Sequence, residues 1–137
     1  FMWKRVVGNE VLNSTEHAIS SPGENSTLLR AYTHRGAPPS PYAVPFDVGT
    51  DVTVILINLD EEEAAVDIAG AVKLRSWALS PGPPGPSSGQ LLLNGIALPA
   101  AFSDGKPIDS IPVAGIEDAG PRLTAPPFSV TFVVASF

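Results

Sequence analysis

The fold is decided by one stretch, Asp51–Asp60, which reads DVTVILINLD. Its apolar residues are nearly all β-branched or large aliphatic, and an acidic residue closes each end. A short run of this composition predicts a strand covered on both faces, rather than a helix. Such a strand needs neighbours to pair with and a second layer to shield it. We therefore expect a β-sandwich with this stretch at its centre.

Other strand candidates lie on both sides of this stretch. Thr27–Arg35 alternates with a period of two, and Phe128–Phe137 places Phe and Val at alternate positions, which predicts one aromatic-rich core face. Asn94-Gly95 lies between two apolar arms and predicts a two-residue hairpin turn, because both residues accept positive φ. With the remaining candidates, we expect about eight antiparallel strands and no helix after Gly8. The remaining candidates are Val11–Ser20, Gln90–Leu98, and Ala64–Ala69 with Lys73–Ser80, which are expected to form a meander with the central strand.

Proline, glycine and acidic residues mark the connections between these strands. Gly36–Pro45 contains four prolines and predicts an exposed loop, and Pro81–Pro86 predicts a stiff linker loop. Glu61–Glu63 follows Asp60 and is typical of a solvated turn between strands. Ile108–Ile116 is expected to be short and irregular.

Composition sets the class of protein. The chain has 137 residues, of which 44% are hydrophobic and 16% charged, so we expect one globular domain. A net charge of −6 argues against non-specific binding to nucleic acid or to an anionic membrane. No apolar stretch has the length of a membrane span. Without cysteine, neither a disulfide nor a thiolate metal site can form.

A search for reactive groups gives no catalytic, cofactor or metal assignment. His17 and His34 are the two imidazoles, and they do not have metal-ligand spacing. Ser87-Ser88-Gly89 lacks the strand-turn-helix context of a nucleophile elbow. The acidic pairs within Asp60–Glu63 and Glu117-Asp118 fall in expected loops. Nothing there would raise the pKa of one carboxyl group above that of the other.

The first eight residues differ from the rest. Met2, Trp3, Val6 and Val7 share a helical face, and Gly8 stands where a C-cap glycine belongs. Because two helical turns are not stable alone in water, we expect residues 1–8 to be the end of a helix that leads into a β domain at residues 9–137. These four apolar side chains would then dock on an adjoining domain. The alternative is a frayed start to a complete domain.

Two features suggest contact with carbohydrate. Asn13-Ser14-Thr15 and Asn25-Ser26-Thr27 are N-glycosylation sequons, which favour a secreted protein. Trp77 is a candidate for stacking on sugar rings, with Tyr32 or Tyr42 beside it, although a Trp in a small β domain is more often in the core.

Five segments, in order, resemble the C-terminal part of heparanase-like glycoside hydrolases (family 79). Together they extend over nearly the whole chain. They are Trp3–Leu12, which resembles the exit from the last barrel helix; Leu29–His34, with its Arg-x-Tyr-x-His pattern; Val54–Leu59; Leu92–Leu98, with its Leu-Asn-Gly hairpin; and Pro126–Phe132.

The resemblance implies a β-sandwich that follows a (β/α)₈ barrel and packs against its side. The catalytic glutamates of that family lie on the barrel, so no catalytic position maps onto this chain. Members are secreted, lysosomal or cell-wall enzymes that cleave β-glucuronide linkages, in polysaccharides such as heparan sulfate or in plant glucuronides. Many members have Cys after the motif's His, where this chain has Arg35, so their disulfide cannot form here. Some relatives also supply an N-terminal strand to the sandwich.

The leading hypothesis is a non-catalytic C-terminal β-sandwich of an endo-β-glucuronidase, with the barrel as its partner. Expressed alone, such a chain should expose an apolar patch. A second hypothesis is an independent extracellular β-sandwich for carbohydrate binding or matrix assembly. A third, an inactive paralogue of the barrel enzyme, cannot be separated from the first on these residues.

Overall fold

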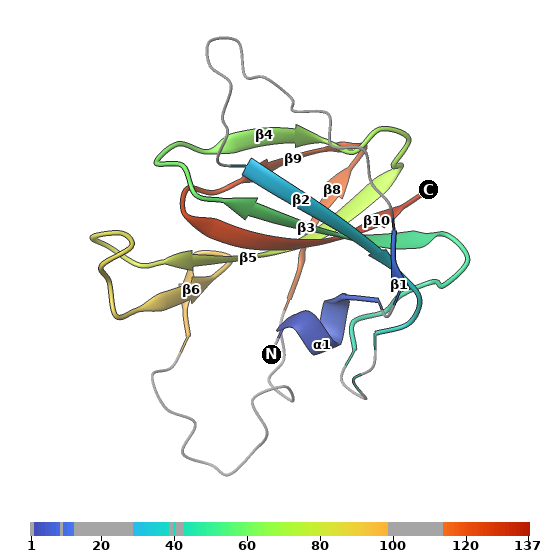
Figure 1. Cartoon of the computed structure of the whole chain (residues 1–137), viewed down its shortest axis with the longest axis horizontal. Helices are drawn as coiled ribbons and strands as arrows, with labels where there is room; N and C mark the ends of the chain where they lie inside the picture. The colour runs from blue at the N-terminus through green and yellow to red at the C-terminus, as the bar shows by residue number, and fades with distance from the viewer. Residues whose placement is uncertain (1, 9, 13–28, 39, 41–42, 99–113) are drawn as a thin grey trace.

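The computed structural model describes residues 2–8, 10–12, 29–38, 40, 43–98 and 114–137 (Figure 1). In this part of the chain, one short helix accompanies ten strands in two antiparallel sheets. The elements are α1 (Met2–Val6), β1 (Glu10–Val11), β2 (Leu29–Arg35), β3 (Asp51–Asn58), β4 (Ala64–Asp67), β5 (Lys73–Pro81), β6 (Leu91–Leu93), β7 (Ile96–Ala97), β8 (Ile116–Ala119), β9 (Arg122–Ala125) and β10 (Ser129–Ser136).

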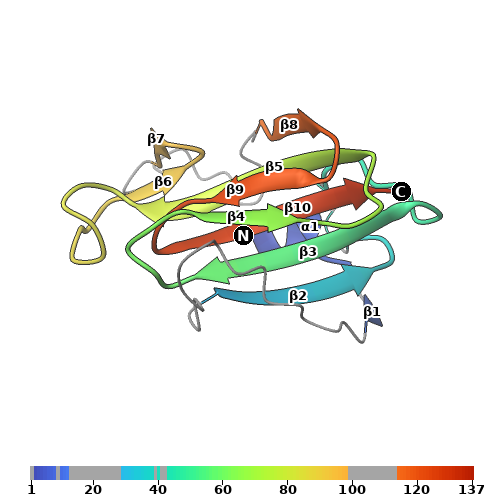
Figure 2. The same cartoon turned by 90° about the horizontal axis from the view of Figure 1, so that it is seen from above.

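The large sheet has the strand order β1-β2-β3-β10-β5-β6-β7, with β8 paired to another part of β5. The small sheet consists of β4 and β9. Figure 2 shows β4 and β9 lying across β10 and its neighbours, and Figure 1 shows α1 on the opposite side of the large sheet. The predicted all-β, antiparallel, sandwich-like fold is confirmed in this form. That α1 is the end of a barrel helix stays a prediction.

The central strand β3 is covered on both faces, as predicted. Side chains alternate between the two sides of the sheet, and Ile55 and Leu56, which point to opposite sides, are 2% and 1% exposed. Strand β10 pairs with β3 along its whole length and is buried in the same way. The prediction that this strand has one core face was therefore incomplete, because both of its faces are buried. Val133 and Ala135 are fully buried on the second face, because the small sheet covers them.

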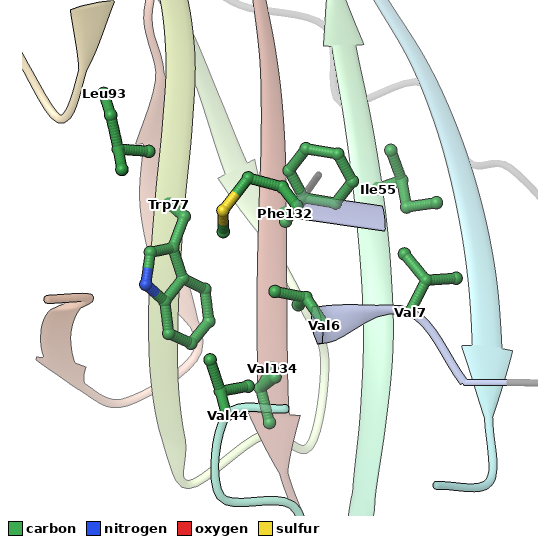
Figure 3. Close-up of a cluster of buried hydrophobic side chains, with 9 residues drawn as sticks. Val6, Val7, Val44, Ile55, Trp77, Leu93, Phe132 and Val134 are labelled. Atoms are coloured by element: carbon green, nitrogen blue, oxygen red, sulfur yellow. The ribbon is translucent and has the colours of Figure 1, made fainter. Parts of the chain in front are cut away.

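Each side of the large sheet has its own hydrophobic core. The α1-side core takes side chains from the helix, from the loop before β3 and from four strands (Figure 3). The small-sheet core lies between the large sheet and β4–β9. The α1-side core contains Met2, Val6, Val7, Val44, Ile55, Trp77, Leu93, Phe132 and Val134. The small-sheet core contains Val54, Leu56, Val66, Ala71, Leu74, Leu123, Ala125, Val133 and Ala135.

The hairpin at Asn94-Gly95 is confirmed. Both residues have positive φ, 50° and 79°, and Leu93 pairs with Ile96 across the turn. The side chain of Asn and the absence of one in Gly tolerate this conformation, which other residues avoid.

The expected meander of β3, β4 and β5 was wrong. β4 pairs with β9, with Val66 opposite Leu123, and so belongs to the small sheet. The side chains of β4 alternate between the core and solvent, and Val66 is the one residue of the strand that is buried. This pattern suits a strand in an outer layer. The central strand β3 pairs instead with β2 and β10.

Two short strands were not predicted. The irregular segment was expected to continue to Ile116, but Ile116–Ala119 forms β8 and Arg122–Ala125 forms β9, separated by Gly120 at φ 95°. Most residues of β8 are exposed and two are acidic, so its sequence lacks the alternation of apolar and polar residues that predicts a strand. The rest of that expected segment, residues 108–113, lies outside the described residues, as do residues 13–20 of the strand expected to begin at Val11.

The proline-rich loop is not wholly exposed. Val44 is 8% exposed and belongs to the α1-side core, and Ser40 is also buried. The segment therefore packs on the sheet at Val44 while its neighbour Pro45 stays exposed.

Candidate functional site

The helix α1 is held on the large sheet by apolar contact and by backbone hydrogen bonds. Met2, Val6 and Val7 are 1% exposed or less and lie against Ile55 and Phe132 (Figure 3). The Thr53 Oγ1 hydroxyl of β3 donates to the Val6 carbonyl at 2.6 Å, and the Val44 amide donates to the Arg5 carbonyl at 3.0 Å. α1 is thus an integral part of this chain's core.

This placement corrects the expected barrel contact of the N-terminal residues. Met2, Val6 and Val7 are used within the chain and are not available to an adjoining domain. The sequence showed that these residues share an apolar face, but an apolar face does not specify which surface will cover it. The side chain of Trp3 lies outside the described part.

Gly8 permits the close approach that follows α1. A Cβ at this position would lie 2.2 Å from the Arg35 carbonyl oxygen and 2.5 Å from the Gly36 carbonyl oxygen. Both neighbours are backbone atoms, which cannot rotate away as a side-chain end can. The predicted helix-ending glycine is therefore also a packing glycine, where the N-terminal segment crosses the end of β2.

Trp77 lies in the α1-side core, which corrects the sugar-stacking hypothesis for this residue. The side chain is 1% exposed, and the Arg75 guanidinium carbon lies 5.3 Å from the ring centroid. Gly115 packs so closely that a Cβ there would lie 2.8 Å from the indole. Neither face of this ring is open to a sugar. Tyr32 is 49% exposed on the same side of the sheet, so it remains accessible.

Beyond α1, the described residues cover this sheet face only in part. Ile57, Val130 and Leu79 stand in one row across β3, β10 and β5, since Val130 pairs with both of the others. All three are half-buried and pack on the edge of the α1-side core. Tyr32 and Leu91, 49% and 46% exposed, flank them on the same face. We call these five residues the open row.

A cavity of about 530 Å³ lies at the opposite end of this face. Its charged groups already serve the fold. Asp51 accepts hydrogen bonds from the Asp47 amide at 2.9 Å and from the Ser136 hydroxyl at 2.7 Å. Lys73 pairs with Glu117 at 3.0 Å, and the Arg75 guanidinium donates to the Pro45 carbonyl. The lining residues are Pro45, Phe46, Asp47, Val48, Asp51, Lys73, Arg75, Val134 and Ser136.

The structure brings no catalytic set together among the residues that it describes. His34 is buried in β2, and Ser87-Ser88-Gly89 forms an exposed turn in which the Ser88 hydroxyl accepts from the Gln90 amide. Glu61–Glu63 is exposed after β3. No group of three His, Asp or Glu side chains within the described ranges could hold a metal ion.

The two sequons and His17 cannot be placed. Asn13, Asn25 and His17 lie outside the described residues, so glycosylation at either asparagine stays a prediction. Asp118, from the second acidic pair, lies in β8 opposite Leu74.

The side-chain hydrogen bonds of two asparagines, Asn58 and Asn94, were not predicted from the sequence. Asn58 is fully buried, and its side-chain Nδ2 lies 2.9 Å from the Glu62 carbonyl and 3.0 Å from the Pro126 carbonyl. Asn94 bonds through its side chain to Ala78 and Ala114. A signal was present for Asn58, because a polar residue that ends an apolar strand must be hydrogen-bonded if it is buried.

The chain matches neither a protein-family model nor a curated protein. Within the described ranges, no helix has the length and apolar character needed to cross a membrane.

Proposed function

We propose that this chain is the non-catalytic C-terminal β-sandwich of a heparanase-like endo-β-glucuronidase. In this proposal it supports a (β/α)₈ barrel that carries the two catalytic glutamates of a retaining glycoside hydrolase. The substrates would be glucuronide-containing polysaccharides or glycans, and the protein would be secreted, lysosomal or associated with the cell wall. The inactive-paralogue alternative shares the same architecture.

The resemblance that motivates the proposal falls on structurally central residues. Val54–Leu59 covers most of β3, Leu92–Leu98 contains the β6–β7 hairpin, and Pro126–Phe132 leads into β10. Residues of these segments make both cores. A match at such positions bears on the fold, because each position carries a packing requirement.

The open row is the observation that carries the proposal. Ile57, Val130 and Leu79 are apolar and half-buried on a sheet face that α1 covers only in part. With Tyr32 and Leu91 they form an apolar surface on one face of five strands. Surfaces of this kind mark sites of contact with another protein surface, here with the side of the barrel.

The charged groups that the structure describes around the cavity are engaged within the fold. The charged side chains around the cavity pair with one another or with the backbone, and the described histidine is buried. A glycoside hydrolase needs two carboxyl groups that converge on one bond, at a separation set by the mechanism. The proposal assigns that pair to the barrel.

The test is a binding measurement with the barrel encoded upstream in the same gene. We expect the separately purified barrel and this chain to form a complex, and we expect a Tyr32→Ser, Leu91→Ser double variant to weaken it. Both side chains are about half exposed, so the variant should still fold. Val72→Ser is the matched control, because Val72 is 66% exposed but lies beyond the opposite end of β5.

The proposal fails if no barrel is encoded upstream, or if the double variant and the control bind equally well. Calorimetry measures both affinities directly. Reading the upstream sequence for two glutamates at the ends of barrel strands tests the parent chemistry independently.

One observation bears on the second hypothesis, an independent carbohydrate-binding module. Tyr32 is 49% exposed, so a single aromatic ring is accessible on this face. The burial of Trp77 removes the second ring of the expected platform. Binding to a glycan array that is lost in Tyr32→Ala, without any effect of Leu91→Ser, would favour this module over the barrel support.

A further inference from the structure

Asn94 stands at a junction between three segments of the chain. Its backbone amide donates to the Ala78 carbonyl at 2.8 Å, and its side-chain Oδ1 accepts from the Ala78 amide at 2.8 Å. Its side-chain Nδ2 donates to the Ala114 carbonyl at 2.9 Å. One residue thus satisfies both backbone groups of Ala78 and holds the start of the segment that leads into β8.

The position of this junction explains why an asparagine is needed. Leu79–Pro81 of β5 pairs with β6, and Lys73–Ser76 of the same edge pairs with β8. Ala78 falls between the two partner strands. The carboxamide of Asn94 takes the place of a partner strand at Ala78. It presents an acceptor to the Ala78 amide and a donor to the Ala114 carbonyl.

The same residue has a chemical liability. In an Asn-Gly pair, the backbone nitrogen of the glycine can attack the side-chain Cγ of the asparagine. A bond from Gly95 N to Asn94 Cγ forms, the bond from Cγ to Nδ2 breaks, and ammonia leaves with the proton from Gly95 N. Water then opens the resulting succinimide to aspartate or isoaspartate. Gly95 has no side chain to hinder the attack, and a Cβ there would meet nothing within 4 Å.

The folded hairpin opposes this reaction. The attack requires Cγ to swing over the Gly95 nitrogen, whereas both polar atoms of the Asn94 side chain are held by Ala78 and Ala114. These contacts break if the hairpin leaves β5. β6 has three residues and β7 has two, and a hairpin of this size has little stability of its own.

We propose that Asn94-Gly95 is a spontaneous deamidation site that the fold gates. It reacts when β6 and β7 separate from β5, and its product cannot restore the junction. In the aspartate product an oxygen replaces the Nδ2 donor and faces the Ala114 carbonyl, so acceptor meets acceptor. The isoaspartate product also adds a methylene to the main chain of a two-residue turn. Modification would therefore loosen the start of the segment that leads into β8. This inference does not depend on the proposed function.

The first experiment uses the unaltered full chain. Samples are kept in mildly alkaline buffer with and without urea, and conversion at each asparagine is followed by peptide mass spectrometry. We expect Asn94 to convert at least about tenfold more slowly in the folded chain than in urea, because opening limits the rate. Asn58 is the internal control, since a branched Leu59 follows it and slows attack even in urea. Equal rates in both samples, or no conversion of Asn94 in urea, would overturn the proposal.

The second experiment measures the product's effect on β8. Asn94→Asp should increase hydrogen exchange at the amides of Ile116–Ala119 at least about tenfold relative to the unaltered chain. Gln90→Glu makes the same amide-to-acid change on an exposed side chain nearby and should leave that exchange unchanged. An Asn94→Asp chain with unaltered exchange in β8 would refute the role of the junction. If that variant does not fold, the comparison of rates in the unaltered chain decides alone.

Discussion

Replacing Asn58 with alanine should cost more stability than almost any other polar substitution in the chain. The side chain is 0% exposed at the end of β3. Its Oδ1 accepts from the Asp60 amide at 3.0 Å, which fixes the turn that leaves the strand. Its Nδ2 faces three backbone carbonyls, those of Glu62 at 2.9 Å, Pro126 at 3.0 Å and Ala125 at 3.3 Å.

The magnitude follows from counting the groups that lose a partner. Nδ2 carries two hydrogens, so it makes two good bonds and one weaker, shared bond; Oδ1 adds another. Three full hydrogen bonds at about 1 kcal/mol each give about 3 kcal/mol, and carbonyls left buried without a donor add about 1–2 kcal/mol. We therefore expect Asn58→Ala to lower the free energy of unfolding by about 4–5 kcal/mol, against a typical total of about 5–15 kcal/mol.

Urea denaturation followed by intrinsic fluorescence measures this loss. Asn58→Asp should be at least as harmful, because it places a carboxylate oxygen against carbonyl oxygens. Glu62→Ala is the matched control, since Asn58 contacts the Glu62 backbone and not its exposed side chain. A loss below about 1 kcal/mol for Asn58→Ala, which is within the range of surface substitutions, would refute the reasoning.

Three further substitutions test the packing of α1 and of its core. Gly8→Ala should destabilise the fold by about 2–4 kcal/mol in thermal unfolding, because its Cβ would overlap backbone oxygens, whereas Gly89→Ala has open space and should be near neutral. Trp77→Ala should cost about 3–5 kcal/mol in the same assay, since it empties the α1-side core. Thr53→Val removes the donor to the Val6 carbonyl and should cost about 1–2 kcal/mol, visible as faster hydrogen exchange in α1; unchanged exchange would contradict it.

The parts of the fold that were predictable are those that local rules determine. β3 could be identified because β-branched residues run between two charged ends. The turn at Asn94-Gly95 could be identified because two adjacent residues accept positive φ. In both cases the information lies within about ten residues of the feature itself.

The parts that failed depend on contacts between distant segments. Val66 has the same alternating neighbours whether β4 pairs with β5 or with β9, so its sequence does not choose between them. The apolar face of α1 would suit a barrel as well as its own sheet. β8 is held by pairing with β5 and by the Lys73–Glu117 ion pair, neither of which leaves an apolar period in the sequence.

The open row exists because α1 is much shorter than the strands on which it packs. α1 has five residues and, at about 1.5 Å per residue, spans about 7.5 Å. β3 and β10 have eight residues each and, at about 3.3 Å per residue, span about 26 Å. α1 is therefore less than a third as long as the strands that it packs on, and the loop at Val44 covers only part of the apolar surface that remains. The open row is the part of that face that lies beyond α1, at the opposite end from the cavity. Its side chains follow the same alternation as the buried ones, so they are the continuation of a core and not isolated surface apolar residues. A strand composition that is apolar on both sides makes sense only if both sides are covered along their whole length, and this is the physical reason to look for a partner at Ile57, Leu79 and Val130.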